Sequence, residues 1–329
     1  MVELLNHCST DNHDPMSQSL NLVFCGTPAF AVPTLERLAA SEFAVRLVAT
    51  QPDRPRGRGL ELAASPVKQK AFELGLRVTQ PEKIKNNEEF RSRLTEIHPD
   101  AIIVVGYGRI IPQWMIGLPP LGNINLHASL LPKYRGAAPI QWAIASGENT
   151  TGVTTMRIDA GLDTGDILLQ KAATIGPNDT AVSLAATLAG IGADLMIETL
   201  RGLGNGTVER HPQDDSRASL APLLKKEDGR IDFHLTATEI SNRWRGFQPW
   251  PGAYTTFRGK ILQLVNTAVV GQRSLPEGEL LIENDLLIAG CHGGAALALL
   301  EVQPEGKKRM RSRDFIHGYR PRSGEKLGH

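Results

Sequence analysis

Short apolar runs alternate with segments of helical spacing along the first two thirds of the chain. Leu20–Cys25 is a mostly apolar run that ends at Gly26, which is typical of a buried strand. The next segment carries apolar residues about 3.6 positions apart, with Thr27 as the expected N-cap and Pro28 as the first helical residue. Val45–Thr50 is the next expected strand. This strand–helix–strand order predicts a doubly wound α/β fold with a mostly parallel, Rossmann-like sheet.

The remaining elements of this region follow from the same periodicities. We expect helices at 66–74, 87–97, 139–145 and 180–201, and strands at 76–78, 100–105, 123–127, 151–158 and 166–173. The run 100–105 is almost entirely apolar, so we expect it at the centre of the sheet.

The pattern changes after residue 205. Glycines break the last long helix, and the polar stretch that follows is predicted to be a linker. Short alternating runs at 253–257, 260–266, 278–283, 286–289 and 296–302 then predict a small antiparallel, OB-like β-barrel. We therefore expect a disordered N-terminal lead-in at 1–19, an α/β domain at 20–205, a linker at 206–222 and the barrel domain at 223–329. Met16, just before the first strand, is a candidate start of translation.

Composition and charge add limits on the class of protein. The chain has 329 residues, of which 41% are hydrophobic and 22% charged, which is ordinary for a globular protein of two domains. The net charge is +1, but residues from 223 onward carry 16 Lys and Arg against 12 Asp and Glu, and the preceding part carries 20 against 23. This asymmetry suggests that a polyanionic partner lies partly against the C-terminal region, although such a difference also arises by scatter.

Cysteine usage and hydropathy point to the cytoplasm. Cys8, Cys25 and Cys291 form no CxxC pair, which suits unbridged thiols in a reducing compartment. Cys25 lies in an apolar strand and is expected to be a core residue. We expect no apolar run to reach the length of a membrane span, and the first 18 residues resemble neither a signal nor a transit peptide.

Polar side chains with catalytic potential end the strand at 123–127. Strand alternation puts Asn125 and His127 on one face, at the carboxyl end where ligands bind in open α/β sheets. Asp163, in the glycine-rich loop at 161–166, is a candidate carboxylate for the same site. The alternative is that the Asn and His only satisfy neighbouring backbone groups, and spacing alone does not decide between the two.

Two loops are candidates for ligand binding. Gly106–Ile111 follows the central strand, and its glycines let a flat ligand approach the backbone, although a merely tight turn fits equally well. Arg54, Arg56 and Arg58 lie in a long loop among prolines and glycines, where guanidinium groups can bind phosphate oxygens. A solvated surface loop is the alternative. The first βα turn lacks GxGxxG, which argues against dinucleotide binding.

These motifs resemble those of folate-dependent formyltransferases. Asn125–His127 followed by Ser129–Pro139 resembles the family signature, and Asp163 falls 36 residues after His127, inside Leu-Asp-Thr-Gly, where the family keeps its carboxylate. Further segments resemble the members that act on initiator methionyl-tRNA, namely Gln51–Pro55, Gly57–Gly59, Ser65–Lys68, Lys226–Asp232, Gln248–Pro251 and Gln303–Lys308. The resemblance covers nearly the whole chain.

The resemblance implies transfer of a formyl group from 10-formyltetrahydrofolate to the α-amino group of methionine on initiator tRNA. Asn125 would stabilise the oxyanion of a tetrahedral intermediate, and His127 would move protons between the two amines. Asp163 would orient the imidazole and favour its charged form. Folate is the implied co-substrate, and no metal is expected, since no cluster of His, Cys and carboxylates has ligand spacing.

The resemblance also implies binding residues. The folate would lie against Gly106, Tyr107, Gly108, Arg109, Ile110, Ser129, Leu130, Leu131 and Pro132. The tRNA would contact Arg54, Arg56, Arg58, Lys307, Lys308 and Arg309. Arg109 departs from the apolar residue expected there and matches relatives that formylate glycinamide ribonucleotide. Leu60 and Glu61 stand where the tRNA enzymes often have two lysines.

Three rival functions stay open on these grounds. An amino-sugar formyltransferase would share the Asn, His and Asp site, although the arginine loop argues against it. A dinucleotide-binding oxidoreductase is disfavoured by the missing GxGxxG, and a catalytically idle nucleic-acid-binding module by the intact site residues. The leading prediction is a cytoplasmic, monomeric enzyme that uses folate and initiator methionyl-tRNA, with no membrane and no protein partner.

Overall fold

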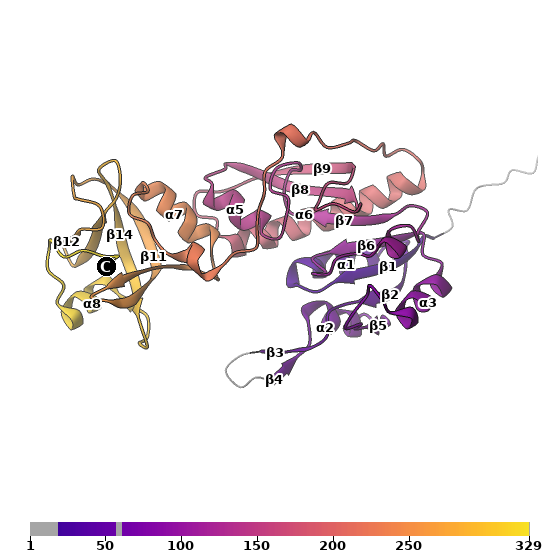
Figure 1. Ribbon diagram of the computed structural model, residues 1–329, viewed down its shortest axis with the longest axis horizontal. Coiled ribbons are helices and arrows are strands. Elements are labelled where there is room, and N and C mark those ends of the chain that lie inside the picture. Colours follow the sequence, from indigo (N-terminus) through magenta and orange to yellow (C-terminus); the bar gives the residue numbers. More distant parts are fainter. Residues whose placement is uncertain (1–18, 57–60, 329) are drawn as a thin grey trace, which may run out of the picture.

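The computed structural model describes residues 19–56 and 61–328. Figure 1 shows an elongated molecule with an α/β domain at one end and a β-rich domain at the other. Most of the expected lead-in, with Cys8 and Met16, lies outside the described residues. The same holds for Arg58 and Leu60 of the arginine loop.

A seven-stranded sheet forms the first domain. Its order is β5-β2-β1-β6-β7-β8-β9; the pairs from β5 to β7 are parallel, and those of β8 with β7 and β9 are antiparallel. The strands are β1 Asn21–Gly26, β2 Ala44–Ala49, β5 Val78–Thr79, β6 Ala101–Val105, β7 Asn123–His127, β8 Thr150–Arg157 and β9 Ile167–Thr174. β6 is buried along its whole length at the middle of the order, as its apolar sequence predicted. The prediction of a doubly wound, mostly parallel sheet is confirmed.

Helices pack on both faces of this sheet. They are α1 Val32–Ala39, α2 Pro66–Glu73, α3 Glu88–Ile97, α4 Gln113–Ile116, α5 Pro139–Ala145 and α6 Ala181–Gly204. Because strand side chains alternate, Leu22 and Phe24 join the core that α1 and α6 cover, whereas Val23 and Cys25 join the core with α3. Cys25 is fully buried, as expected, and burial raises the pKa of its thiol to about 12.

The predicted start of the first helix is wrong. Pro28 is extended, Ala29–Ala31 forms a 3-10 turn, and α1 begins only at Val32. Thr27 does not cap a helix; instead its hydroxyl donates a 3.2 Å hydrogen bond to the carbonyl oxygen of Tyr107. Thr27 therefore ties the first βα turn to the loop after β6.

α6 is more apolar than the sequence analysis allowed. The helix has 24 residues and contains a stretch whose mean hydropathy is 1.5, so it is long and apolar enough to cross a membrane. The expectation that no apolar run reaches this length is therefore wrong. The helix packs on β8 and β9 and against α1, and its apolar side chains contribute to the main core of the domain. This packing explains its composition.

An antiparallel sheet forms the second domain, with the order β10-β11-β14-β13-β12 and with β15 paired to β14. Its elements are α7 Ala237–Gly246, β10 Ala253–Phe257, β11 Lys260–Gln272, β12 Leu280–Glu283, β13 Leu286–Gly290, β14 Ala295–Pro304, β15 Met310–Arg311 and α8 Ser312–Tyr319. The end of the chain bridges the two edge strands. Leu280 in β12 donates to the carbonyl oxygen of Glu325, and Gly328 donates to that of Thr256 in β10. The predicted small barrel is thereby confirmed, whereas α7 is absent from the prediction.

The arginine loop is more regular at its base than predicted. It forms two short antiparallel strands, β3 Arg54–Arg56 and β4 Glu61–Ala63, which project from the lower edge of the first domain in Figure 1. Lys68 and Gln80 donate hydrogen bonds of 2.6 and 2.8 Å to the carboxylate of Asp53. The hydrogen bond from Lys68, and to a smaller extent the one from Gln80, holds the pKa of Asp53 below its usual range. They fix the base of the hairpin on α2 and on the end of β5.

Candidate active site

β7 ends in the pair of side chains that strand alternation predicted. His127 is 5% exposed, and Asn125, two residues earlier on the same face, is partly exposed. Asn123 shares this face, but its amide donates to the carbonyl oxygens of Met115 and Ile116, which is a structural role. Since β6 and β8 pair with β7 on its two sides, the backbone that carries Asn125 and His127 is held rigidly.

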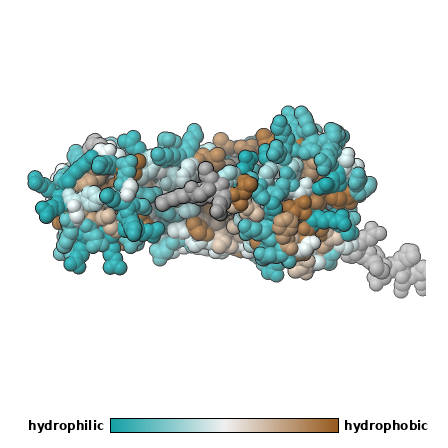
Figure 2. All heavy atoms as spheres, turned by 90° about the horizontal axis from the view of Figure 1, so that it is seen from below, coloured by the Kyte–Doolittle hydropathy of each residue, from teal (hydrophilic) through white to brown (hydrophobic). Residues whose placement is uncertain are grey.

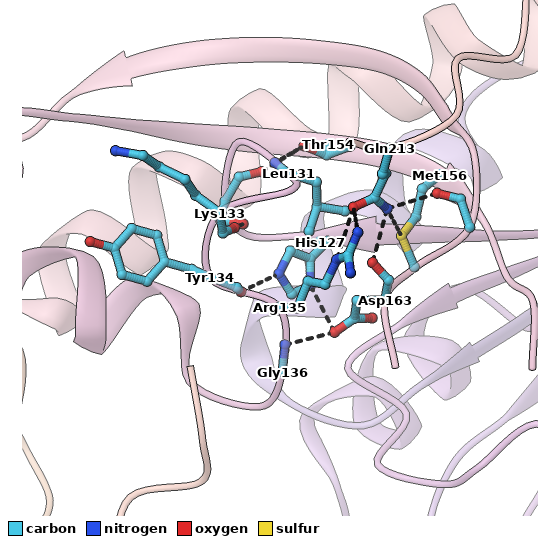
Figure 3. Close-up of polar contacts among 12 residues, drawn as sticks. His127, Leu131, Lys133, Tyr134, Arg135, Gly136, Thr154, Met156, Asp163 and Gln213 are labelled. Carbon is cyan, nitrogen blue, oxygen red and sulfur yellow. Dashed lines mark hydrogen bonds and ion pairs between the residues drawn. The ribbon is translucent and has the colours of Figure 1, made fainter. Parts of the chain in front are cut away.

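Both ring nitrogens of His127 face oxygen atoms (Figure 3). Nε2 lies 2.9 Å from the carbonyl oxygen of Tyr134, and Nδ1 lies 3.6 Å from Oδ2 of Asp163. Because a carbonyl oxygen only accepts hydrogen bonds, Nε2 carries a proton, and Nδ1 is the basic nitrogen of the neutral ring. The 3.6 Å separation is too long for a direct hydrogen bond but short enough for the carboxylate to stabilise a positive ring. The alternative role, in which His127 only satisfies a neighbouring backbone group, therefore accounts for Nε2 but leaves Nδ1 available for chemistry.

Asp163 reaches this position through a left-handed backbone. Its φ is 52°, a conformation that is costly for most residues but is adopted by Asp more often than by most others. Its Oδ2 accepts a 2.9 Å hydrogen bond from the backbone N–H of Gly136. Gly165, two residues later, leaves no room for a side chain, because a Cβ there would lie 1.8 Å from the carbonyl oxygen of Arg157. The Leu-Asp-Thr-Gly sequence thus suits a tight loop that turns the carboxylate toward His127.

The segment predicted as a linker, 206–222, lies against this site. The backbones of His211 and Ile167 exchange two hydrogen bonds of 2.9 Å, at the start of β9. Further on, the N–H of Arg135 donates a 2.8 Å bond to the carbonyl oxygen of Ser219. The segment is therefore docked on both sides of the site loops, which a prediction from its polar composition does not anticipate.

Gln213, in this docked segment, is a site residue that the sequence analysis missed. Its Nε2 donates to the carbonyl oxygens of Asp163 and Gly165 over 2.9 and 2.7 Å. Its Oε1 accepts from Nε and Nη2 of Arg135 over 3.0 and 2.9 Å (Figure 3). Arg135 is 7% exposed and also pairs with Asp215 over 2.8 Å. No periodicity distinguishes Gln213 from the polar residues around it, so no sequence pattern could have found it.

The first loop expected to bind folate follows β6. Gly106 and Gly108 have φ values of 55° and 72°, which favour glycine. The side-chain amide of Gln51 donates to the carbonyl oxygens of Tyr107 and Gly108 over 2.9 and 3.1 Å. Tyr107 is 1% exposed, so the residue belongs to the core, and its carbonyl oxygen accepts hydrogen bonds from Thr27 and Gln51. Ile110 is 92% exposed and is the most accessible apolar side chain of this loop.

The other expected folate residues divide into buried and accessible ones. Ser129 and Leu131 are buried, and the Ser129 hydroxyl donates a 2.6 Å bond to the carbonyl oxygen of Lys133, so both stabilise the loop itself. Leu130 and Pro132 are partly exposed. Arg109 is partly buried, and its Nε has no hydrogen-bond partner among the residues that the structure describes.

The expected tRNA-binding residues lie apart from this site. Arg54 is exposed in β3, and Lys307, Lys308 and Arg309 are exposed in the turn between β14 and β15. Figure 2, seen from below, shows a mostly hydrophilic surface on the C-terminal domain and apolar residues near the middle of the molecule. Within residues 19–56 and 61–328, no group of three or more His, Cys, Asp or Glu is placed to hold a metal ion.

Comparison with known proteins gives the family. Residues 20–200 match the formyl transferase model, and residues 223–320 match the model of the formyl transferase C-terminal domain. The chain therefore belongs to the formyl transferase family. It is 65% identical over 307 residues to the methionyl-tRNA formyltransferase of Koribacter versatilis, a match that covers 93% of this chain and 98% of that protein. It is 59% identical to the methionyl-tRNA formyltransferase of Acidobacterium capsulatum, over 91% of this chain and 96% of that protein.

Solved structures share the fold. An N-formyltransferase from Helicobacter canadensis, in complex with folinic acid and dTDP-3-aminofucose, matches with a TM-score of 0.62 at 21% identity. The match covers 87% of this chain and 99% of that one. At this identity the likeness concerns the fold alone.

Proposed function

We propose that this enzyme transfers the formyl group of 10-formyltetrahydrofolate to the α-amino group of methionine on initiator tRNA. The product is N-formylmethionyl-tRNA, which serves the initiation of translation in the cytoplasm. The observation that carries the proposal is the His127–Asp163 pair beside Asn125, in a chain 65% identical to a methionyl-tRNA formyltransferase. We expect the enzyme to act as a monomer.

His127 moves the protons of the reaction. The neutral α-amine attacks the formyl carbon, and its nitrogen becomes cationic in the tetrahedral intermediate. Nδ1 of His127 accepts that proton and returns one to the folate nitrogen as the bond between this nitrogen and the formyl carbon breaks. The hydrogen bond from Nε2 to Tyr134 keeps Nδ1 turned toward the reacting groups.

Asn125 and Asp163 stabilise the charges that develop during this transfer. The Asn125 amide donates to the oxyanion of the intermediate, an interaction typically worth about 3 kcal/mol. The carboxylate of Asp163, 3.6 Å from Nδ1, stabilises the imidazolium that forms when His127 takes the proton. Both groups stand on fixed backbone, so little reorganisation accompanies the reaction.

The substrates approach from two directions in this proposal. Folate binds the backbone of Gly106–Ile110 and the adjoining loop 129–132. The tRNA contacts the arginine hairpin with Arg54, Arg56 and Arg58, and its backbone follows Lys307, Lys308 and Arg309 on the second domain. The exposure of Arg54 and of the three basic residues after β14 supports this path.

One assay tests the proposed function. The purified protein is incubated with 10-formyltetrahydrofolate and charged initiator methionyl-tRNA, and formyl-methionyl-tRNA is measured. We expect formylation of the tRNA and none of a dTDP-amino sugar. Formylation of the amino sugar, with none of the tRNA, would assign the enzyme to the sugar branch of the family.

Replacing Arg58 with alanine is expected to raise the KM for the tRNA by about tenfold, with little change in kcat. A lost phosphate contact weakens binding and lowers by about one the slope of log affinity against log salt. Steady-state kinetics and tRNA binding between low and high salt measure both effects. Arg93→Ala is the matched control, because Arg93 is an exposed arginine of α3 whose ion-pair partner, within the described part of the chain, is Glu89. Wild-type behaviour of Arg58→Ala at every salt concentration would remove the hairpin from the tRNA path.

A further inference from the structure

We infer that Gln213 is a positioning residue that holds Asp163 in its catalytic conformation. The inference rests on the proposed function of Asp163, but its evidence is separate. It concerns a residue of the segment between the two domains, which contributes no group to the proposed chemistry. Gln213 acts on the backbone of the loop, and the loop then places the carboxylate.

Gln213 contacts the loop where its backbone conformation is least favourable, at Asp163. The left-handed φ of Asp163 is a conformation that persists only when surrounding contacts fix it. The Gln213 amide donates to the carbonyl oxygens on both sides of the tight turn, those of Asp163 and Gly165. Asp163 is therefore held twice, by Gln213 at its backbone and by the N–H of Gly136 at its carboxylate.

The position of the Gln213 side chain is itself fixed by Arg135. A buried guanidinium must find acceptors, and Arg135 directs Nε and Nη2 to Oε1 of Gln213. This contact sets which end of the Gln213 amide faces the loop, because Oε1 must meet Arg135 and Nε2 must then meet the two carbonyl oxygens. The backbone hydrogen bonds of His211 and Ser219 fix the segment on either side. Gln213 is also less exposed than its immediate neighbours, as expected for a residue aimed into the site.

The test is Gln213→Glu, in which a carboxylate keeps an acceptor for Arg135 but cannot donate to the loop. We expect kcat to fall by about 100-fold, as small displacements of a catalytic group commonly cause. The KM for the tRNA should stay within about twofold of wild type, since no lost contact faces the tRNA. Gln213→Met, of similar length with neither donor nor charge, should lower kcat in the same way. Gln272→Glu, the same change on the exposed end of β11, is the matched control and should keep wild-type kinetics.

A double mutant separates positioning from general stability. In the background of Asp163→Asn, adding Gln213→Glu should cause no more than about a threefold further loss of kcat, because both changes affect one unit. Independent, multiplying losses would overturn the inference. A Gln213→Glu enzyme with wild-type kcat would overturn it as well, while the proposed function would stand.

A second readout does not depend on activity. If Gln213 holds the loop, amide hydrogen exchange in residues 161–166 should become at least about tenfold faster in Gln213→Glu, while exchange in β7 stays slow. Unchanged exchange in the loop would overturn the inference even if the protein formylated no tRNA. Absence of tRNA formylation by the wild type, together with faster loop exchange in the variant, would count against the proposed function alone.

Discussion

His127→Ala should lower kcat for the formylation of methionyl-tRNA by about two to four orders of magnitude, the range that a positioned general acid–base supplies. The variant loses Nδ1, which in the proposed mechanism takes the proton of the attacking amine and returns one to the folate nitrogen. It also loses the hydrogen bond to Tyr134, yet the strands on either side of β7 keep its backbone in place. Single-turnover kinetics at saturating substrates measure the loss of kcat apart from binding.

The outcome must be separated from a loss of structure, because His127 is buried. His127→Gln keeps a donor for the Tyr134 carbonyl oxygen but has no titratable nitrogen, so it should restore thermal stability and leave kcat low. His317→Ala, at an exposed position of α8, should match wild type in both respects. Recovery of kcat in His127→Gln would show that the ring acts only through its contact with Tyr134.

Periodicity predicted the fold where one type of contact decides the local structure. The apolar runs of β1 and β6 bury both faces, and the helical spacing over 139–145 matches α5 residue for residue. It was wrong at Thr27, where the N-cap pattern was present but the hydroxyl binds Tyr107, about 80 residues away in the chain. It also missed α7, although Thr236 and Glu239 form a capping box that is visible in the sequence. A tertiary contact overrode the N-cap signal at Thr27, and short strand-like runs nearby obscured the capping box at Thr236.

Closure of the barrel and docking of the linker could not be predicted by any local pattern. Residues 324–328 have no strand-like alternation, yet they supply the backbone groups that join β12 to β10. The polar segment 206–222 resembles a solvated linker because its side chains are mostly exposed, while its backbone binds the site loops. Backbone hydrogen bonds of this kind depend on where two distant segments meet, and side-chain composition carries little trace of them.

Some residues of the candidate site could be predicted from the sequence, and others could not. Strand alternation alone placed Asn125 and His127 together, and the structure brings Asp163 within 3.6 Å of the ring. Asp163 was a candidate carboxylate from its glycine-rich loop, and the family resemblance then supplied its role, since a loop carboxylate has no periodicity to relate it to a strand. Gln213 was indicated neither by strand alternation nor by the family resemblance. Its role depends on hydrogen bonds with the buried Arg135, 78 positions earlier in the chain, so the residue becomes visible in three dimensions alone.

Asp163→Asn should lower kcat by about two to three orders of magnitude, the scale of one preorganised electrostatic contact in a water-excluded site. Asparagine also adopts a left-handed backbone readily, and its Oδ1 can accept the hydrogen bond from Gly136. The substitution therefore removes the negative charge beside Nδ1 and little else. Kinetics with saturating folate and tRNA, together with thermal unfolding, measure the two consequences separately.

Asp159→Asn is the matched control, because Asp159 is an exposed carboxylate that accepts hydrogen bonds from Gly161 and Thr164 within the same loop. It should leave kcat within about twofold of wild type, because the Oδ1 of asparagine can still accept the hydrogen bonds of Gly161 and Thr164. If Asp163→Asn kept wild-type kcat, the carboxylate would serve only to anchor Gly136, and the positive ring would need no partner. A full loss in Asp163→Asn with unchanged thermal stability would instead require that charge, because backbone, size and hydrogen bond are all retained. Only the stabilisation of the protonated His127 would then differ between the two enzymes.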